Sequence, residues 1–218
     1  MGGTLGVVFR HRPLQQFDCD RMLDSVREVF AANNIDVDLR CSEVASLGAP
    51  QMSRVSVNGC SSAIFEHGAM FRLVPLVSPD ELVVFIVQSI ADGIGPFAGC
   101  AEHPPGTPGL VITEAAARGG LSSSAANGRW VLAHELAHVL GVARHDVDST
   151  KLLNESATAI TAPIPLIDRS QQNAINSSRC LGRTGFSRAR VVPERTIPVR
   201  ETPSHFDRPR SHFDRRLR

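Results

Sequence analysis

The sequence predicts an α+β fold, in which a few strands alternate with amphipathic helices. Three observations lead to this prediction. The first third of the chain has the pattern of a strand, a helix and a second strand, a continuous apolar segment follows at residues 81–90, and two further helices are expected at residues 129–140 and 168–180. Of the 218 residues, 42% are hydrophobic and 21% charged, and the longest apolar run is much shorter than the roughly 20 residues of a membrane-spanning helix. No membrane span is therefore predicted.

The N-terminal elements have clear local signals. Residues 4–12 are rich in β-forming side chains, and apolar residues then recur at helical spacing over residues 17–34. Asp18 or Asp20 can cap the start of this helix, because a carboxylate there can accept from its first free backbone amides. Residues 35–42 alternate apolar and polar side chains, which is the pattern of a half-buried strand.

The middle of the chain is more irregular. Residues 46–80 are punctuated by Gly, Ser and Pro, and we expect a loop with one or two short strands. The sequence ELVVFIVQSI, at residues 81–90, predicts a continuous strand that is buried on both faces. A shorter strand is predicted for GLVIT, at residues 109–113.

Two helices follow this segment. The first runs from about Arg129 to Leu140, with Asn127 as a possible cap and Gly141 as its stop. The second begins at Asp168, whose carboxylate can cap it.

The chain is predicted to consist of a domain at residues 1–182 and a tail at residues 183–218. The tail is rich in Arg and Pro and repeats a seven-residue unit, SHFDRPR followed by SHFDRRL, so it is expected to be disordered. It holds 10 Arg and 4 acids, whereas the domain holds 13 basic and 18 acidic residues. The few aromatic residues of the tail, among them Phe206 and Phe213, do not form a set that stacks on bases, so a nucleic-acid partner is not favoured.

The cysteines exclude a zinc finger, because no CxxC pair is present. One or two disulfides in an oxidising compartment, or five buried thiols in a reducing one, both fit the positions Cys19, Cys41, Cys60, Cys100 and Cys180. The first residues, MGGTLGVVFRHR, lack the features of a secretory leader. A mature secreted form would look the same, so the compartment is left open.

The segment RWVLAHELAHVLGVARHD contains the residues that predict chemistry. His134 and His138 stand four residues apart on a helix, so both imidazoles project from one face and can share a metal ion. Catalytic zinc takes three protein ligands and leaves one coordination position open, and its distance to a histidine nitrogen is about 2.0–2.1 Å. Glu135 is turned by about 100° around the helix, which places it beside the metal and not on it, as a general base requires.

Gly141 can end this helix in a left-handed conformation and turn the chain back toward the metal. The chain here resembles the metzincin clan of zinc endopeptidases, whose motif is HExxHxxGxxH or HExxHxxGxxD. The position of the third ligand in that motif holds Arg144, and His145 comes one residue late. An extra residue adds about 3.3 Å, which a bulged loop can absorb. We therefore assign His145 as the third ligand, with Asp146 or Asp148 as alternatives.

The resemblance covers roughly residues 4–182 and implies a metzincin-like fold. Such a fold has a small mixed, twisted sheet over helices, an active-site helix, and a C-terminal subdomain with one helix. It also implies that residues 109–113 form the antiparallel edge strand that pairs with substrate, and that Asp146 supports a ligand from behind. A methionine-containing turn lies below the metal in this clan, and here Leu153 takes the place of the methionine. Leu and Met exchange at modest cost.

The leading hypothesis is a zinc-dependent endopeptidase that acts on protein or peptide substrates. One zinc ion is held by His134, His138 and His145, and Glu135 is the general base. Two alternatives remain: a gluzincin-like peptidase that uses Glu155 as third ligand, and a non-catalytic zinc-binding module derived from a protease fold. A third possibility is a nucleic-acid binder that acts through the tail. We expect a monomer, and the resemblance favours secretion.

Overall fold

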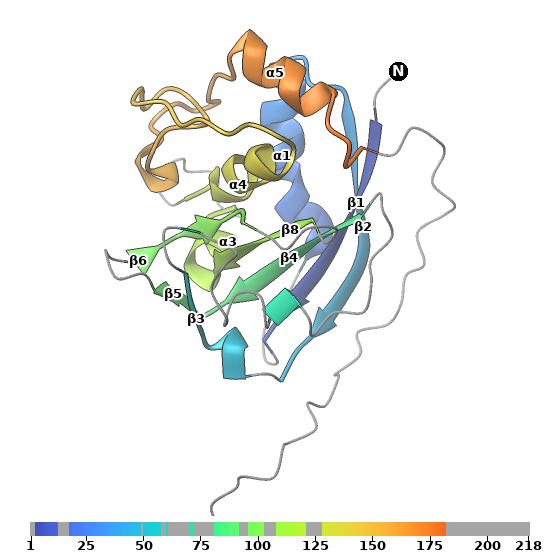
Figure 1. Cartoon of the computed structure of the whole chain (residues 1–218), viewed down its shortest axis with the longest axis vertical. Coiled ribbons are helices and arrows are strands. Elements are labelled where there is room, and N and C mark those ends of the chain that lie inside the picture. The colour runs from blue at the N-terminus through green and yellow to red at the C-terminus, as the bar shows by residue number, and fades with distance from the viewer. Residues whose placement is uncertain are drawn as a thin grey trace, which may run out of the picture.

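A computed structural model of the chain describes residues 3–12, 18–48, 50–57, 60, 70–71, 81–91, 96–102, 108–120 and 128–181. Its centre is a five-stranded mixed sheet of order β2-β1-β4-β8-β7, which confirms the α+β prediction (Figure 1). Its strands are β1 (Gly3–His11), β2 (Val37–Ser46), β4 (Glu81–Val87), β7 (Gly99–Cys100) and β8 (Gly109–Thr113). All neighbours are parallel except β7, which is antiparallel to β8. The predicted tail at residues 183–218 lies outside the described residues, as does Asn127.

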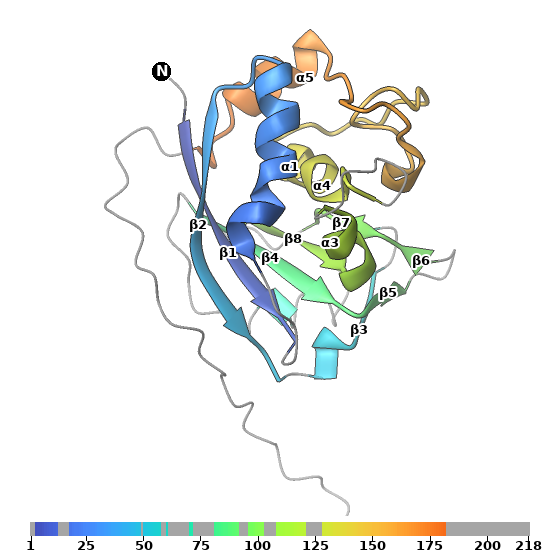
Figure 2. The same ribbon diagram turned by 180° about the vertical axis from the view of Figure 1, so that it is seen from behind.

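Three helices cover one face of this sheet (Figure 2). They are α1 (Cys19–Ala32), α3 (Glu114–Gly120) and α4 (Val131–Val139). The cap of α1 is Asp18, which accepts from the backbone N–H of Arg21 at 3.0 Å, and a disulfide between Cys19 and Cys41 ties this helix to β2. The helix α4 begins after Trp130, which makes no side-chain cap. The helix α3 was not predicted from the sequence, because its small residues carry no helical periodicity.

The opposite face is covered by a second, smaller sheet. It consists of β3 (Arg54–Ser56), β5 (Ser89–Ala91) and β6 (Pro96–Phe97), together with the short 3-10 helix η1 (Pro50–Met52). Because successive residues of β4 point to opposite faces, Val83 and Phe85 join this second core while Leu82 and Val84 join the first. The sheet is therefore buried on both sides, as the apolar run in β4 predicted.

Two strand predictions need correction. Residues 81–90 do not form one strand: β4 ends at Val87, and after Gln88 the chain enters the second sheet as β5. The prediction that residues 109–113 form the antiparallel edge strand is wrong. That strand is β8, which lies between β4 and β7 and is parallel to β4, and all five of its residues are buried. The edge strand next to β8 is β7, which has only two residues and therefore no recognisable sequence pattern.

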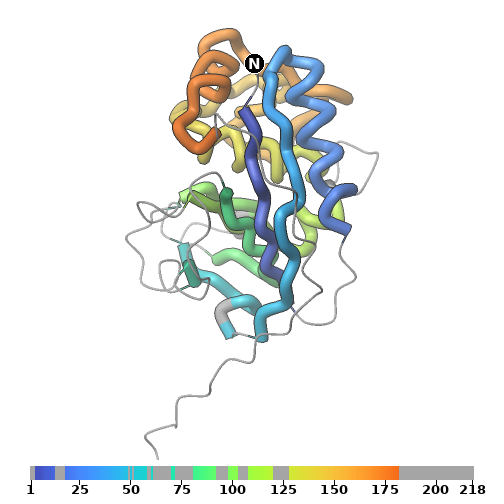
Figure 3. Tube along the Cα trace, turned by 90° about the vertical axis from the view of Figure 1, so that its right-hand side faces the viewer, coloured from blue at the N-terminus to red at the C-terminus, as the bar shows by residue number. Residues whose placement is uncertain are grey.

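The C-terminal part packs over one end of the sheet, close to the N-terminus (Figure 3). It contains a short 3-10 helix, η3 (Ala157–Ala159), and one α-helix, α5 (Arg169–Asn176), which Asp168 caps as predicted. The buried side chain of Asn33 joins it to α1 by donating to the carbonyl of Pro165 at 3.0 Å and accepting from the N–H of Ile167 at 2.8 Å. Among the described residues, no helix is long and apolar enough to cross a membrane.

Candidate metal centre

The helix α4 carries two of the predicted metal ligands into the interior. It is apolar around most of its circumference, so its polar side chains are buried with it: His134 is 3% and Glu135 7% exposed, and His138 is half-buried. Buried imidazole and carboxyl groups lose their hydration and need partners in the protein or a bound ion.

Gly141 ends α4 and turns the chain toward these histidines, as predicted. Its φ is +110°, a left-handed conformation that favours glycine. The backbone N–H of Gly141 donates to the carbonyl oxygen of His138 at 2.9 Å, and that of Val142 donates to the carbonyl oxygen of Ala137 at 3.0 Å. Together these two bonds form a Schellman motif. Four residues after Gly141 the ring of His145 reaches the two helical histidines, so the extra residue before it is accommodated.

The three imidazoles meet through their Nε2 atoms. The Nε2 of His138 lies 3.2 Å from that of His134 and 3.0 Å from that of His145. Nitrogens on one tetrahedral zinc ion are about 3.4 Å apart, so this spacing is close to what a shared ion requires. Within the described part of the chain, these three histidines are the one group of potential ligands that converges in this way.

Hydrogen bonds fix which ring nitrogen of the two helical histidines is free. The Nδ1 of His134 lies 2.8 Å from the carbonyl oxygen of Leu152, and that of His138 lies 2.6 Å from that of Val142. A carbonyl can only accept, so each Nδ1 carries the proton and each Nε2 presents a lone pair. Two lone pairs at 3.2 Å repel each other unless a cation lies between them. The donor set therefore fits a divalent metal.

The electrostatics favour neutral imidazoles, which is the form that binds metal. Burial lowers the pKa of His134 from 6.5 to about 3, and repulsion from His138 adds to this effect. Burial also lowers the pKa of His138, against the opposing effect of its hydrogen bond to Val142. Both histidines are therefore unprotonated at neutral pH, and their Nε2 lone pairs are available for coordination.

Glu135 lies beside this cluster and does not belong to it. Burial raises the pKa of its carboxyl from 4.5 to about 8. Its side chain packs against Gly99 in the edge strand β7: a Cβ on Gly99 would lie 2.6 Å from the Cγ and 2.7 Å from the Oε1 of Glu135. Gly99 thus leaves the space that Glu135 occupies, a role that no sequence pattern indicated.

We expect Gly99→Ala to lower kcat roughly 100-fold for any reaction that uses the Glu135 carboxylate, because the added methyl group forces this carboxylate away from its position. The free energy of unfolding should change little, since a side chain moves and not the backbone. Steady-state kinetics and urea unfolding measure the two effects. The matched control is Gly48→Ala, where a Cβ meets nothing within 4 Å. Equal activity of the two variants would contradict the role of Gly99.

The raised pKa of Glu135 predicts a pH effect in the metal-free protein. Between pH 4.5 and 8 the unfolded state loses the Glu135 proton and the folded state keeps it, so stability falls as the pH rises. The cost reaches about 5 kcal/mol above pH 8, by the relation of one pKa unit to 1.4 kcal/mol. With EDTA present, Glu135→Gln should therefore be more stable than wild type at about pH 9 and equal to it near pH 4.5.

The difference in free energy of unfolding between wild type and Glu135→Gln reports the contribution of Glu135 alone. The lowered pKa of His134 removes stability from both proteins as the pH falls below 6.5, so its contribution cancels. Urea unfolding curves across this pH range measure the difference, and a gap that is independent of pH would contradict the buried acid.

A turn at residues 151–154 lies against the cluster and contains Leu153, the residue predicted to take the place of a methionine. Leu152 supplies the carbonyl that holds the ring of His134, and Leu153 is completely buried. The N–H of Asp146 donates to the carbonyl of Leu153 at 2.7 Å, which ties the segment after His145 to this turn.

Leu153→Ala should lower the free energy of unfolding by about 2–5 kcal/mol, because it removes a buried side chain and leaves a cavity. Leu153→Met keeps the volume and should cost less than about 1.5 kcal/mol. Chemical unfolding of both variants measures the difference. A Met variant as unstable as the Ala variant would show that the site does not accept the exchange.

The other acidic candidates do not join the cluster. The carboxylate of Asp146 accepts a hydrogen bond from the N–H of Asp148 at 3.0 Å, and carbonyl oxygens lie against the rings of His134 and His138, so the idea that Asp146 orients a ligand stays a prediction. Asp148 accepts from the backbone and side chain of Thr150. Glu155 is exposed. Backbone carbonyls hold the histidines instead, and a sequence pattern cannot indicate these.

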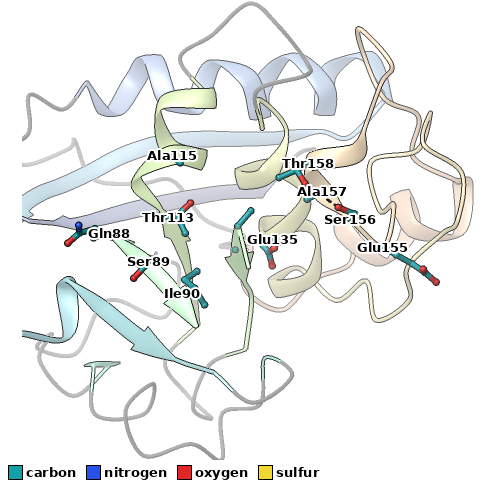
Figure 4. A pocket seen from close by; sticks show the side chains of 12 residues that line it. Gln88, Ser89, Ile90, Thr113, Ala115, Glu135, Glu155, Ser156, Ala157 and Thr158 are labelled. Atoms are coloured by element: carbon teal, nitrogen blue, oxygen red, sulfur yellow. Dashed lines mark hydrogen bonds between the residues drawn. The ribbon is translucent and has the colours of Figure 1, made fainter. Parts of the chain in front are cut away.

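A cavity of about 510 Å³ opens beside Glu135. Its walls come from β5, the edge of the main sheet and the segment after the turn, and they carry mostly small or hydroxyl side chains such as Ser89, Thr113 and Thr158 (Figure 4). Glu155 lies at the rim, and its carboxylate points away from the other lining side chains. The cavity can therefore hold a side chain or a short segment of a bound molecule next to the Glu135 carboxyl.

Comparison with solved structures shows that the fold is that of known metallopeptidases. The archaemetzincin from Methanopyrus kandleri has a TM-score of 0.50 and 14% identity, over 79% of this chain and 93% of that chain. The metalloproteinase-II from Bacteroides fragilis has the same TM-score and identity, over 84% of this chain and 54% of that chain, so the match spans about half of its length. No protein-family model matches the sequence, and no curated protein matches it.

Proposed function

We propose that this protein is a zinc-dependent endopeptidase of the metzincin type, in which His134, His138 and His145 hold one zinc ion. The observation that carries the proposal is the convergence of three Nε2 atoms beside a buried carboxyl that stays outside their group. Three nitrogen donors with one open position are typical of catalytic zinc sites. The similarity of the fold to two metallopeptidases supports the same conclusion.

Zinc at this position would supply a Lewis acid that polarises the carbonyl of the scissile peptide bond and lowers the pKa of water. The protein's own contribution begins with the two backbone carbonyls that fix the tautomers of His134 and His138. Because these rings are held from behind, their Nε2 atoms stay aimed at the shared position without further ordering.

Glu135 is the group that moves protons in this proposal. Its carboxylate takes a proton from the attacking water and passes it to the nitrogen of the departing amine. Burial alone would keep Glu135 protonated at neutral pH, since its pKa is raised to about 8. A cation on the neighbouring imidazoles favours the carboxylate, so Glu135 becomes a base only when the histidines are loaded.

The substrate is proposed to be an extended peptide. The strand β7 is the last in the main sheet, so its outer edge can pair with a peptide backbone by strand addition. Gly99 in this strand touches Glu135, which would bring the paired peptide to the general base. The cavity next to Glu135 then receives a side chain of the peptide close to the bond that is cleaved.

The test combines a metal analysis with a digest. We expect purified protein to bind one zinc ion per chain and to cleave casein or a peptide library, and we expect a chelator to stop cleavage and added zinc to restore it. Zinc binding without cleavage would identify a non-catalytic module. Protein that binds no zinc would overturn the proposal as a whole.

A further inference from the structure

A pair of cysteines, Cys60 and Cys100, lies next to Gly99, the residue of β7 against which Glu135 packs. Cys100 follows Gly99 in β7, and Cys60 packs against the buried cluster to which Cys100 belongs. The Cys60 thiol also donates to the carbonyl of Gly99, with the sulfur 3.8 Å from the oxygen. Two residues that are 40 positions apart thus meet one residue away from the contact between Gly99 and Glu135.

The two thiols differ in access and reactivity. Cys60 is half-buried and has a φ of +58°, whereas Cys100 is completely buried. The hydrogen bond to Cys60 and, after it, burial raise the pKa of the Cys100 thiol far above its usual range. An incoming reagent therefore reaches Cys60 first, and Cys100 is placed to react only with what has formed on Cys60.

We propose that Cys60 and Cys100 form a dithiol modification site that is oxidised to a disulfide by low-molecular-weight disulfides. The Cys60 thiolate attacks one sulfur of the reagent, whose S–S bond breaks and releases one thiolate. Cys100 then loses its proton and attacks the Cys60 sulfur, which expels the second thiolate. Two protein thiols thereby lose two protons and two electrons, and the reagent is reduced to two thiols.

The new bond changes the position of β7. Bonded sulfurs lie about 2.0 Å apart, much closer than the sulfurs of two thiols that only pack against each other. The bond also removes the thiol hydrogen that Cys60 donates to Gly99. Gly99 and Glu135 are packed so closely that not even a methyl group fits between them, so a shift of β7 moves the general base. This consequence rests on the proposed peptidase function, and we expect oxidation to lower kcat roughly ten-fold without loss of zinc.

The covalent step is tested without reference to activity. Full-length protein is equilibrated with mixtures of reduced and oxidised glutathione, denatured, alkylated and analysed by intact mass and peptide mapping. Three alkylated cysteines are expected under reducing mixtures that leave the Cys19–Cys41 disulfide intact, and one after oxidation, with residues 60 and 100 in linked peptides. The variants C60S and C100S should lose this response. The matched control, C180S, changes a half-buried thiol elsewhere and should retain it.

Three outcomes would overturn the proposal. These are three labels that persist under oxidation, a stable glutathione adduct on Cys60 beside a free Cys100, and a disulfide that involves Cys180. Kinetics of the oxidised and reduced forms then test the link to Glu135. A linked pair with unchanged kcat would overturn the link alone. A linked pair in a protein that cleaves nothing in either form would refute the proposed function and leave the dithiol site standing.

Discussion

Glu135→Gln is expected to lower kcat for peptide cleavage by about 10²- to 10⁴-fold while zinc stays bound. The amide keeps the shape of the side chain but cannot take a proton from water at the pH of the assay. The three imidazoles are unchanged, because Glu135 stands outside their group. Single-turnover and steady-state kinetics measure the rate, and metal analysis of the same sample measures zinc.

The control for this variant is Glu155→Gln, which changes the other carboxylate at the same cavity. Glu155 is exposed at the rim and supplies none of the converging ligand atoms. Its substitution should therefore leave zinc bound and keep kcat within about three-fold of wild type. Loss of zinc in Glu155→Gln would favour the gluzincin-like alternative. Undiminished cleavage in Glu135→Gln would rule out Glu135 as the general base.

His145→Ala is expected to weaken zinc binding by more than about 100-fold. Loss of a residue that only supports a ligand already weakens metal binding by about 10- to 100-fold, and loss of the ligand itself should cost more. The side chain supplies one of the three Nε2 atoms, 3.0 Å from that of His138. Cleavage should fall with zinc occupancy and return in part when zinc is supplied in excess. Competition with a fluorescent chelator gives the affinity, and kinetics at several zinc concentrations give the activity.

Asp148→Asn is the matched control, because Asp148 is the neighbouring acid that the sequence also allowed as a ligand. Its carboxylate bonds to Thr150, and the amide oxygen of Asn can accept the same hydrogen bonds. Zinc affinity should therefore stay within about three-fold of wild type. If His145→Ala retained zinc and Asp148→Asn lost it, the assignment of the third ligand would be wrong.

The local patterns of the sequence predicted those features that depend on residues close together in the chain. Helical spacing placed His134 and His138 on one face of α4, and the glycine three residues later predicted the left-handed stop that the structure has. The same reasoning predicted the cap Asp168 and left the first cap to Asp18 or Asp20, of which the structure has Asp18. Each of these depends on hydrogen bonds or side-chain neighbours within about one turn, which the order of residues specifies directly.

Contacts between distant segments could not be predicted in this way. The antiparallel edge of the main sheet is β7, a strand of two residues, and its role was wrongly given to β8. The small-residue helix α3 and the support of His134 by the carbonyl of Leu152 also have no local pattern. Main-chain groups are the same at every position, so only their placement in space gives them a function.

The sequence by itself determined the donor atoms: two imidazoles one helical turn apart, a carboxyl between them, and a third imidazole a few residues after a glycine. The tertiary structure alone decided how these groups are tuned. It buried Glu135 against Gly99, fixed the protons of His134 and His138 on the sides that face carbonyl oxygens, and brought Cys60 to Cys100. The physical reason is that desolvation and close packing depend on every segment that surrounds a group, whereas helical spacing depends only on its neighbours in the chain.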